Sequence, residues 1–110
     1  MEGHALQQRK AAEEFAQRMR RAPPDRKMAF KLYGSVARGT SEWDSDVDVF
    51  LRADQIDKPL LQIKSQLAFD VSLDYDVVLS VVTYSDEEYA DRAVQYTPFI
   101  EHVKREGITI

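Results

Sequence analysis

The chain has 110 residues, of which 44% are hydrophobic and 31% are charged, and its net charge is −4. This length suits one compact domain, so we expect a single domain over residues 1–110. No apolar run approaches the roughly 18 residues of a membrane span, and the lack of cysteine excludes disulfides, thiolate metal sites and a cysteine nucleophile. The N-terminus shows no apolar signal core, so we predict a cytoplasmic protein.

Charge is distributed unevenly along the sequence. Residues 1–41 hold 9 Lys and Arg against 4 Asp and Glu, whereas residues 42–110 hold 6 against 15. An acidic protein with a basic first third is a poor general binder of nucleic acid, which we therefore do not expect as the main ligand. The basic part can present a positive face to phosphates, and the acidic part suits a basic partner.

The first half of the chain predicts one helix and two strands. Residues 4–21 are rich in strong helix formers with a rough apolar stripe of Leu6, Ala12, Phe15 and Met19, and the prolines at 23 and 24 end this helix. Residues 27–33 are apolar and aromatic and run into a glycine, as a strand that enters a turn does. Residues 46–52 alternate acidic and apolar side chains and predict the second strand.

The second half predicts a helix, a strand and two shorter helices. Apolar residues recur at helical spacing from Asp57, a suitable N-cap, to about residue 73. Residues 75–83 are dense in β-branched side chains and predict the third strand. Ser85 begins a capping-box pattern, which predicts the start of another helix. Thr97-Pro98 interrupts that helix and begins a last one. The fold class is therefore α/β or α+β, with a small mixed sheet of three or four strands packed with helices.

Residues 34–51, GSVARGTSEWDSDVDVFL, place acidic side chains inside an apolar strand. Side chains alternate along a strand, so Asp46 and Asp48 point to one face about 7 Å apart, while Val47 and Val49 point to the other. Two carboxylates this close repel each other unless a cation lies between them. Magnesium and manganese prefer such oxygen ligands, so this face predicts a metal site.

The turn before this strand predicts a phosphate contact. Gly34 ends the first strand, and glycine lets the backbone approach a ligand closely. Exposed N–H groups at such a turn bind phosphate oxygens, and the Ser35 hydroxyl adds a donor. Ten residues separate Ser35 from Asp46, and together with Asp46 and Asp48 the stretch is typical of a site that handles a nucleoside triphosphate with its metal ion.

Parts of residues 34–51 also approach two known binding loops. GSVARGT nearly matches a phosphate-binding Walker A loop, but Thr40 stands where that loop has lysine. The aspartates at 44, 46 and 48 resemble the first ligands of a calcium-binding EF-hand loop, but Val49 stands where that loop needs glycine. The aspartates would also suit a solvated sheet face or edge without any ligand.

The joint pattern Gly34-Ser35, ten residues, Asp46-x-Asp48 between two strands resembles the signature of the polymerase-β-like nucleotidyltransferase superfamily. A wider string resembles its minimal nucleotidyltransferase branch and comprises Gly34, Ser35, Ala37, Arg38, Gly39, Ser45, Asp46 and Asp48. The Glu-Gly-Ile ending at residues 106–108 also looks like the short proteins of this branch.

The resemblance implies a role for each motif residue. Asp46 and Asp48 would hold two Mg²⁺ ions, with Mn²⁺ as an alternative, and Gly34 and Ser35 would hold the β and γ phosphates of ATP. Arg38 would contact phosphate or form a loop salt bridge.

A third carboxylate on a neighbouring strand normally completes the second ion's site in this superfamily. Asp76 and Asp74 are the candidates here. We favour Asp76 because it lies nearer the interior of the predicted third strand, whereas Asp74 would end the preceding helix. Trp43 would stack on a base or simply be an exposed loop residue.

By the same resemblance, the chain would transfer a nucleoside monophosphate, AMP from ATP, to a hydroxyl. Proteins of the minimal branch are often paired with a helical HEPN-domain toxin, and they act as antitoxins that can adenylylate a toxin tyrosine. We therefore expect a HEPN-domain partner and no membrane partner, and we leave the oligomeric state open. The alternative is a non-catalytic antitoxin that neutralises its partner by contact.

Overall fold

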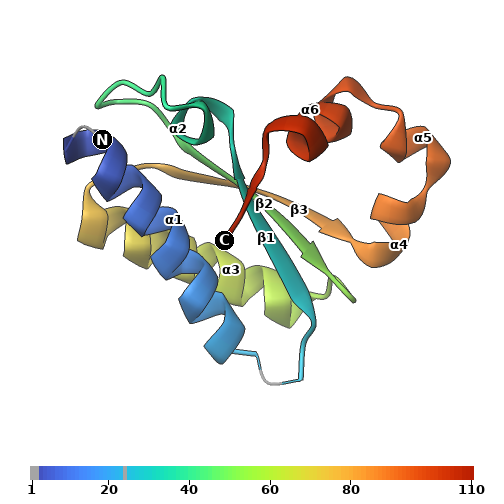
Figure 1. Cartoon of the computed structure of the whole chain (residues 1–110). Helices are drawn as coiled ribbons and strands as arrows, with labels where there is room; N and C mark the ends of the chain where they lie inside the picture. Colours follow the sequence, from blue (N-terminus) through green and yellow to red (C-terminus); the bar gives the residue numbers. More distant parts are fainter. Residues whose placement is uncertain (1–2, 24) are drawn as a thin grey trace.

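The computed structural model describes residues 3–23 and 25–110. Within them the chain forms a four-stranded sheet with helices on both of its faces (Figure 1). The elements in chain order are α1 (Gly3–Arg21), β1 (Met28–Tyr33), α2 (Gly34–Arg38), β2 (Val47–Ala53), α3 (Lys58–Tyr75), β3 (Leu79–Ser85), α4 (Asp86–Ala90), α5 (Arg92–Gln95), α6 (Pro98–Glu106) and β4 (Ile108–Thr109). The predicted fold class, a small mixed sheet packed with helices, is confirmed.

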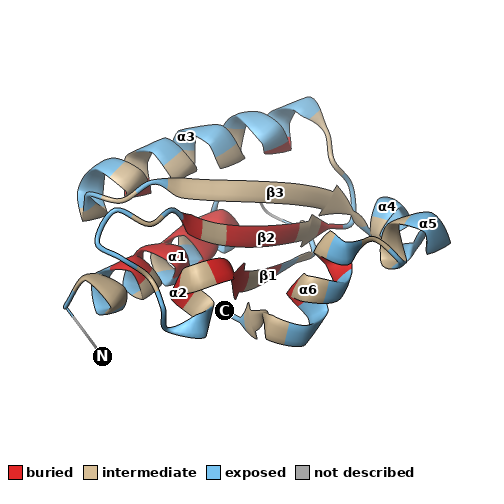
Figure 2. Ribbon diagram, turned by 90° about the horizontal axis from the view of Figure 1, so that it is seen from above, coloured by how far each residue is buried: buried red, intermediate tan, exposed pale blue. Residues whose placement is uncertain are grey.

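The sheet has the strand order β3-β2-β1-β4 and mixes two kinds of pairing. β1 pairs antiparallel with β2 and with β4, and β2 pairs parallel with β3. A parallel pair needs a long crossover, and α3 supplies it between β2 and β3. The arrangement puts β2 at the centre of the sheet, where Figure 2 shows it largely buried while β3 is half-buried along its whole length.

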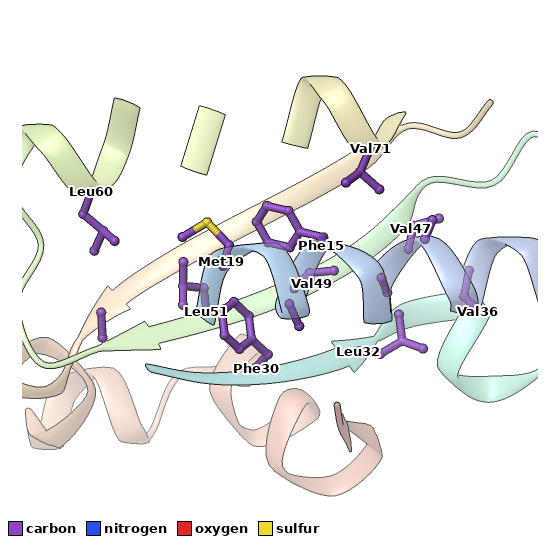
Figure 3. Packing of buried hydrophobic residues seen from close by; sticks show 14 residues of the cluster. Phe15, Met19, Phe30, Leu32, Val36, Val47, Val49, Leu51, Leu60 and Val71 are labelled. Atoms are coloured by element: carbon purple, nitrogen blue, oxygen red, sulfur yellow. The ribbon is translucent and has the colours of Figure 1, made fainter. Parts of the chain in front are cut away.

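The main core lies between the sheet and the helices α1 and α3. Phe15 and Met19 of α1 point among the side chains of β1, β2 and α3 (Figure 3), and both are fully buried. Phe15 meets Phe30 of β1 edge to face, with ring centroids 6.1 Å apart. From β2, this core receives Val47, Val49, Leu51 and Ala53. The strand alternation expected from the sequence therefore holds for the apolar side chains.

A second, smaller cluster covers part of the opposite sheet face. It is built from Tyr33, Phe50, Ile100 and Val103, with Tyr84, Tyr89, Val94 and Phe99 packed around it. α6 supplies two of its buried residues. The face that carries Asp48 is thus aromatic and covered in the middle of β2, at Phe50, and half-exposed at Asp48 and at Arg52 on either side of it.

The predicted caps determine where the later helices begin. Asp57 accepts a hydrogen bond from the Leu60 N–H and caps α3. Ser85 and Glu88 form a complete capping box at α4, and Thr97 caps α6 ahead of Pro98. These local predictions are confirmed.

Four details differ from the sequence expectation. Leu6 is 44% exposed and does not join the buried stripe of α1. β3 begins at Leu79 and not at residue 75, because α3 continues through Tyr75. The helix expected from Ser85 breaks at Asp91, whose side chain caps the separate helix α5. β2 begins at Val47, so Asp46 lies just before the strand and not in it. Pro24, one of the two prolines expected to end α1, lies outside the described residues, and that part of the prediction is not tested.

Phe15→Ala should lower the free energy of unfolding by about 3–5 kcal/mol, because it removes a fully buried ring and leaves a cavity. Phe69→Ala is the matched control, since Phe69 is 59% exposed and its loss should change stability by about 0.5 kcal/mol or less. Urea unfolding of the three chains measures both values. Equal losses in the two variants would contradict the assignment of the core.

Candidate active site

The site lies where β1 ends and β2 begins. The antiparallel register pairs Tyr33, the last residue of β1, with Asp48. The chain then turns at Gly34, which has a φ of +77° and opens the short helix α2. A β-carbon placed on Gly34 would lie 2.2 Å from Oδ2 of Asp48. Only glycine therefore fits at this position, both for its backbone conformation and for the space that it leaves to the carboxylate.

The two carboxylates are not neutralised by neighbouring cations. Among residues 3–23 and 25–110, neither Asp46 nor Asp48 forms an ion pair or accepts a side-chain hydrogen bond. Burial raises the pKa of Asp48, the negative charge of Asp46 raises it further, and Arg38 opposes the rise. The protein thus keeps two mutually repelling carboxylates together, which suits the binding of a divalent cation.

Tyr33, on the neighbouring strand, is affected by the charge of Asp48. Burial, followed by the charge of Asp48 and the neighbouring Tyr84, raises the pKa of Tyr33 to about 12. The phenol therefore stays protonated at neutral pH. An uncharged Tyr33 adds no further negative charge beside Asp48.

α2 presents polar groups at the same turn. Within the described part of the chain, its N-cap Tyr33 makes no side-chain capping bond to the helix, and the Ser35 hydroxyl has no hydrogen-bond partner. The backbone N–H groups at the start of α2 and the Ser35 hydroxyl are therefore available to an external acceptor. Gly39 ends α2 in the left-handed conformation, and its N–H bonds to the carbonyls of Ser35 and Val36.

Arg38 points toward α6. Its Nη1 lies 3.3 Å from Oε2 of Glu106 and 3.5 Å from Nε2 of His102. His102 also lies 3.2 Å from the same Glu106 oxygen. Of the two roles expected for Arg38, the structure contains the salt bridge, which connects α2 to the C-terminal helix while the arginine charge still acts on Asp48.

Asp76 does not lie in a strand, which corrects the position predicted for it. Because α3 extends to Tyr75, Asp76 is the C-cap of that helix, exposed and in the left-handed conformation with a φ of +53°. Asp tolerates this conformation better than most residues. In the described ranges, no three Asp, Glu, His or Cys side chains come together as one ion's ligands, so Asp76 does not join Asp46 and Asp48.

Asp74, the second candidate for a third carboxylate, is directed elsewhere. It lies in the last turn of α3, as expected, and Arg18 of α1 donates to it at 2.9 Å. This ion pair connects the two helices that cover the core. Asp74 therefore has a structural contact away from β2.

Ser80 is the residue of this region that the sequence motifs do not indicate. The parallel register of β2 and β3 pairs Asp48 with Ser80. Paired residues in adjacent strands lie about 4.8 Å apart and point to the same face. Ser80 is half-buried and occupies the place next to Asp48 at which a third ligand from the neighbouring strand would stand.

A cavity of about 390 Å³ lies beside this edge of the sheet. It is lined by His4, Gln7, Gln8, Trp43, Asp44, Ser45, Asp76, Val77 and Val78, and Trp43 is 78% exposed. Asp46 and Asp48 do not line it. Trp43 is therefore an exposed loop residue.

The fold and this site define a nucleotidyltransferase of the polymerase-β-like class. The family model described as "Nucleotidyltransferase domain" matches residues 12–104. The chain belongs to this family, and membership supports transfer of a nucleotidyl group. None of the curated proteins that were compared with the chain matches it. No helix among the described residues is long and apolar enough to cross a membrane.

Gly34→Ala should destabilise the fold more than Gly39→Ala. Both glycines have a φ of +77°, but a β-carbon on Gly39 would meet no atom within 4 Å from the rest of the described chain, apart from its own chain neighbours. We expect a loss of about 1–2 kcal/mol for Gly39→Ala from the left-handed conformation alone. Gly34→Ala should lose a further ~1–3 kcal/mol from the clash with Asp48.

Urea unfolding measures the difference between these two variants. The clash is tested in a chain that also carries Asp48→Ala, where the gap between the two glycine variants should shrink. An unchanged gap would mean that the Asp48 carboxylate does not cause the extra loss.

Asp48→Asn should raise the melting temperature at neutral pH in the absence of divalent ions. A raised pKa means that folding favours protonated Asp48, so its contribution to stability falls as pH rises from the ordinary value of 3.8 through the raised pKa. The advantage of the asparagine should therefore disappear below about pH 4. Melting curves across this range measure it, with exposed Asp44→Asn as control. A variant less stable than the parent at neutral pH would contradict the argument.

Proposed function

We propose that this protein is a divalent-metal-dependent nucleotidyltransferase that transfers AMP from ATP to a hydroxyl group. The acceptor is a HEPN-domain toxin, which the protein modifies as an antitoxin. The observation that carries the reaction class is the close approach of Gly34 to Asp48, because it joins a phosphate-type turn to the carboxylate pair at the start of β2 within a domain of the nucleotidyltransferase family. The acceptor and the nucleotide follow from the resemblance to the minimal branch.

Asp46 and Asp48 are the residues that would hold a divalent cation. The fit rests on the absence of any ion pair to Asp46 or Asp48 among the described residues and on the space that Gly34 leaves for the Asp48 carboxylate. A bound Mg²⁺ or Mn²⁺ would supply charge neutralisation for the triphosphate. Ser35 and the backbone N–H groups at the start of α2 would donate hydrogen bonds to its phosphate oxygens.

The reaction consists of one in-line displacement. The acceptor oxygen forms a bond to the α-phosphorus, and the bond from that phosphorus to the oxygen bridging the β-phosphate breaks. Pyrophosphate leaves with that oxygen, and the proton of the acceptor hydroxyl passes to solvent. The protein contributes positioning and charge stabilisation, which are the main requirements of phosphoryl transfer.

A second function has one observation in its favour. In the described part of the chain, no third acidic ligand joins Asp46 and Asp48. The site then lacks the third carboxylate that the resemblance to the superfamily leads one to expect. This favours the non-catalytic alternative, in which the chain neutralises a partner by contact.

Asp46→Asn and Asp48→Asn should each lower AMP transfer from labelled ATP to the co-purified HEPN partner by roughly 100-fold or more, because each removes an oxygen ligand near the reacting phosphate. Asp44→Asn is the matched control, since Asp44 is exposed two residues before the pair and should leave transfer unchanged. Label incorporation and toxin neutralisation are measured on the same samples. If transfer and neutralisation both survive in the Asp46 and Asp48 variants, the catalytic account is wrong. If the parent and all variants neutralise the toxin without any AMP transfer, the non-catalytic alternative, neutralisation by contact, is correct.

A further inference from the structure

We propose that this site binds one divalent ion per chain. The cause is Ser80, a neutral residue that stands beside Asp48 where a third carboxylate would be needed to hold a second ion. The inference rests on the proposed function and concerns the number of ions held beside Asp46 and Asp48. The resemblance to the superfamily implies two ions. The side chains that the structure brings together favour one.

The strand register places Ser80 beside Asp48. β2 and β3 are paired residue by residue from Val47↔Leu79 to Ala53↔Ser85, without a bulge, so Asp48 has Ser80 as its neighbour. The Val47 N–H bonds to the carbonyl of Val78 at 2.8 Å, which anchors this register at the end of the sheet where the site lies. Ser80 therefore points to the same face as Asp48.

Among the described residues, no further acid joins Asp46 and Asp48 in one group of ligands. On the far side of Asp48, the paired residue of β1 is Tyr33, whose side chain is a phenol and not a carboxylate. Asp76 precedes the first residue of β3 by three positions and caps α3. The ligands that the two neighbouring strands offer next to Asp48 are thus a phenol and a hydroxyl.

Charge balance limits the number of ions. One Mg²⁺ or Mn²⁺ ion is matched by two carboxylates and the oxygens of a triphosphate. A second divalent ion close to the first adds two positive charges and needs a further anionic ligand to offset the repulsion between the ions. Ser80 supplies a neutral oxygen. The site is therefore complete for the ion that accompanies the triphosphate and incomplete for a second one.

Ser80→Asp should build the missing site. We expect one Mn²⁺ per chain for the parent in the presence of a non-hydrolysable ATP analogue, and two for Ser80→Asp. The second ion of Ser80→Asp should bind at least tenfold more tightly than any second ion that the parent takes up at high Mn²⁺ concentration. Ser80→Asn is the matched control, because it adds nearly the same volume without charge and should remain at one ion. Titration calorimetry and Mn²⁺ electron paramagnetic resonance count the ions without any need for turnover.

Two results overturn the inference. One is a parent chain that binds two Mn²⁺ ions, above all if Asp76→Asn loses one of them, since Asp76 would then be the third ligand. The other is a folded Ser80→Asp chain that still binds one ion. If Ser80→Asp does not fold, the numbers of Mn²⁺ ions bound by the parent, Ser80→Asn and Asp76→Asn still test whether the site holds one ion or two. A parent that binds no Mn²⁺ with or without nucleotide overturns the proposed function as well, so the two failures are distinguishable.

Discussion

The site depends on the register between β1 and β2. Because Tyr33 pairs with Asp48, the turn at Gly34 passes directly over the carboxylate, and a β-carbon there would lie 2.2 Å from its oxygen. The same register sends Val47 and Val49 into the core beneath α1 and α3. A slip of one residue would bury Asp48 and expose the valines, so the packing of the core fixes the position of the acid.

The two sheet faces satisfy different requirements. The face toward α1 and α3 is mostly apolar, and it provides most of the buried side chains. The opposite face changes character along β2, from Asp48 at its beginning to Phe50 under α6. The raised pKa of Asp48 shows that the fold holds this carboxylate against its own electrostatic preference. A charged group held where it lowers the stability of the fold is typical of functional sites.

Local signals determine how much of this fold can be predicted from the sequence. The caps at Asp57, Ser85 and Thr97 are predictable because a capping bond joins residues two or three positions apart. The pairing of Arg38 with Glu106 spans 68 residues and leaves no local pattern. The sequence places the start of β3 too early, because β-branched residues at 77 and 78 extend the apolar run, whereas the left-handed cap at Asp76 and the pairing with β2 determine where the strand begins.

The same distinction separates the part of the site that its motif determines from the part that requires the structure. Gly34 and Ser35 directly follow β1, and Asp46 and Asp48 lie at the start of β2, its antiparallel neighbour, so the spacing of a single motif determines their geometry. The neighbour of Asp48 on its other side comes from β3, which follows an 18-residue helix. Moving the start of that strand by two residues would place a different side chain at the same point on the same face. The identity of Ser80 as this neighbour is therefore a property of the parallel register, and the motif can indicate the carboxylate pair without indicating how many ions it holds.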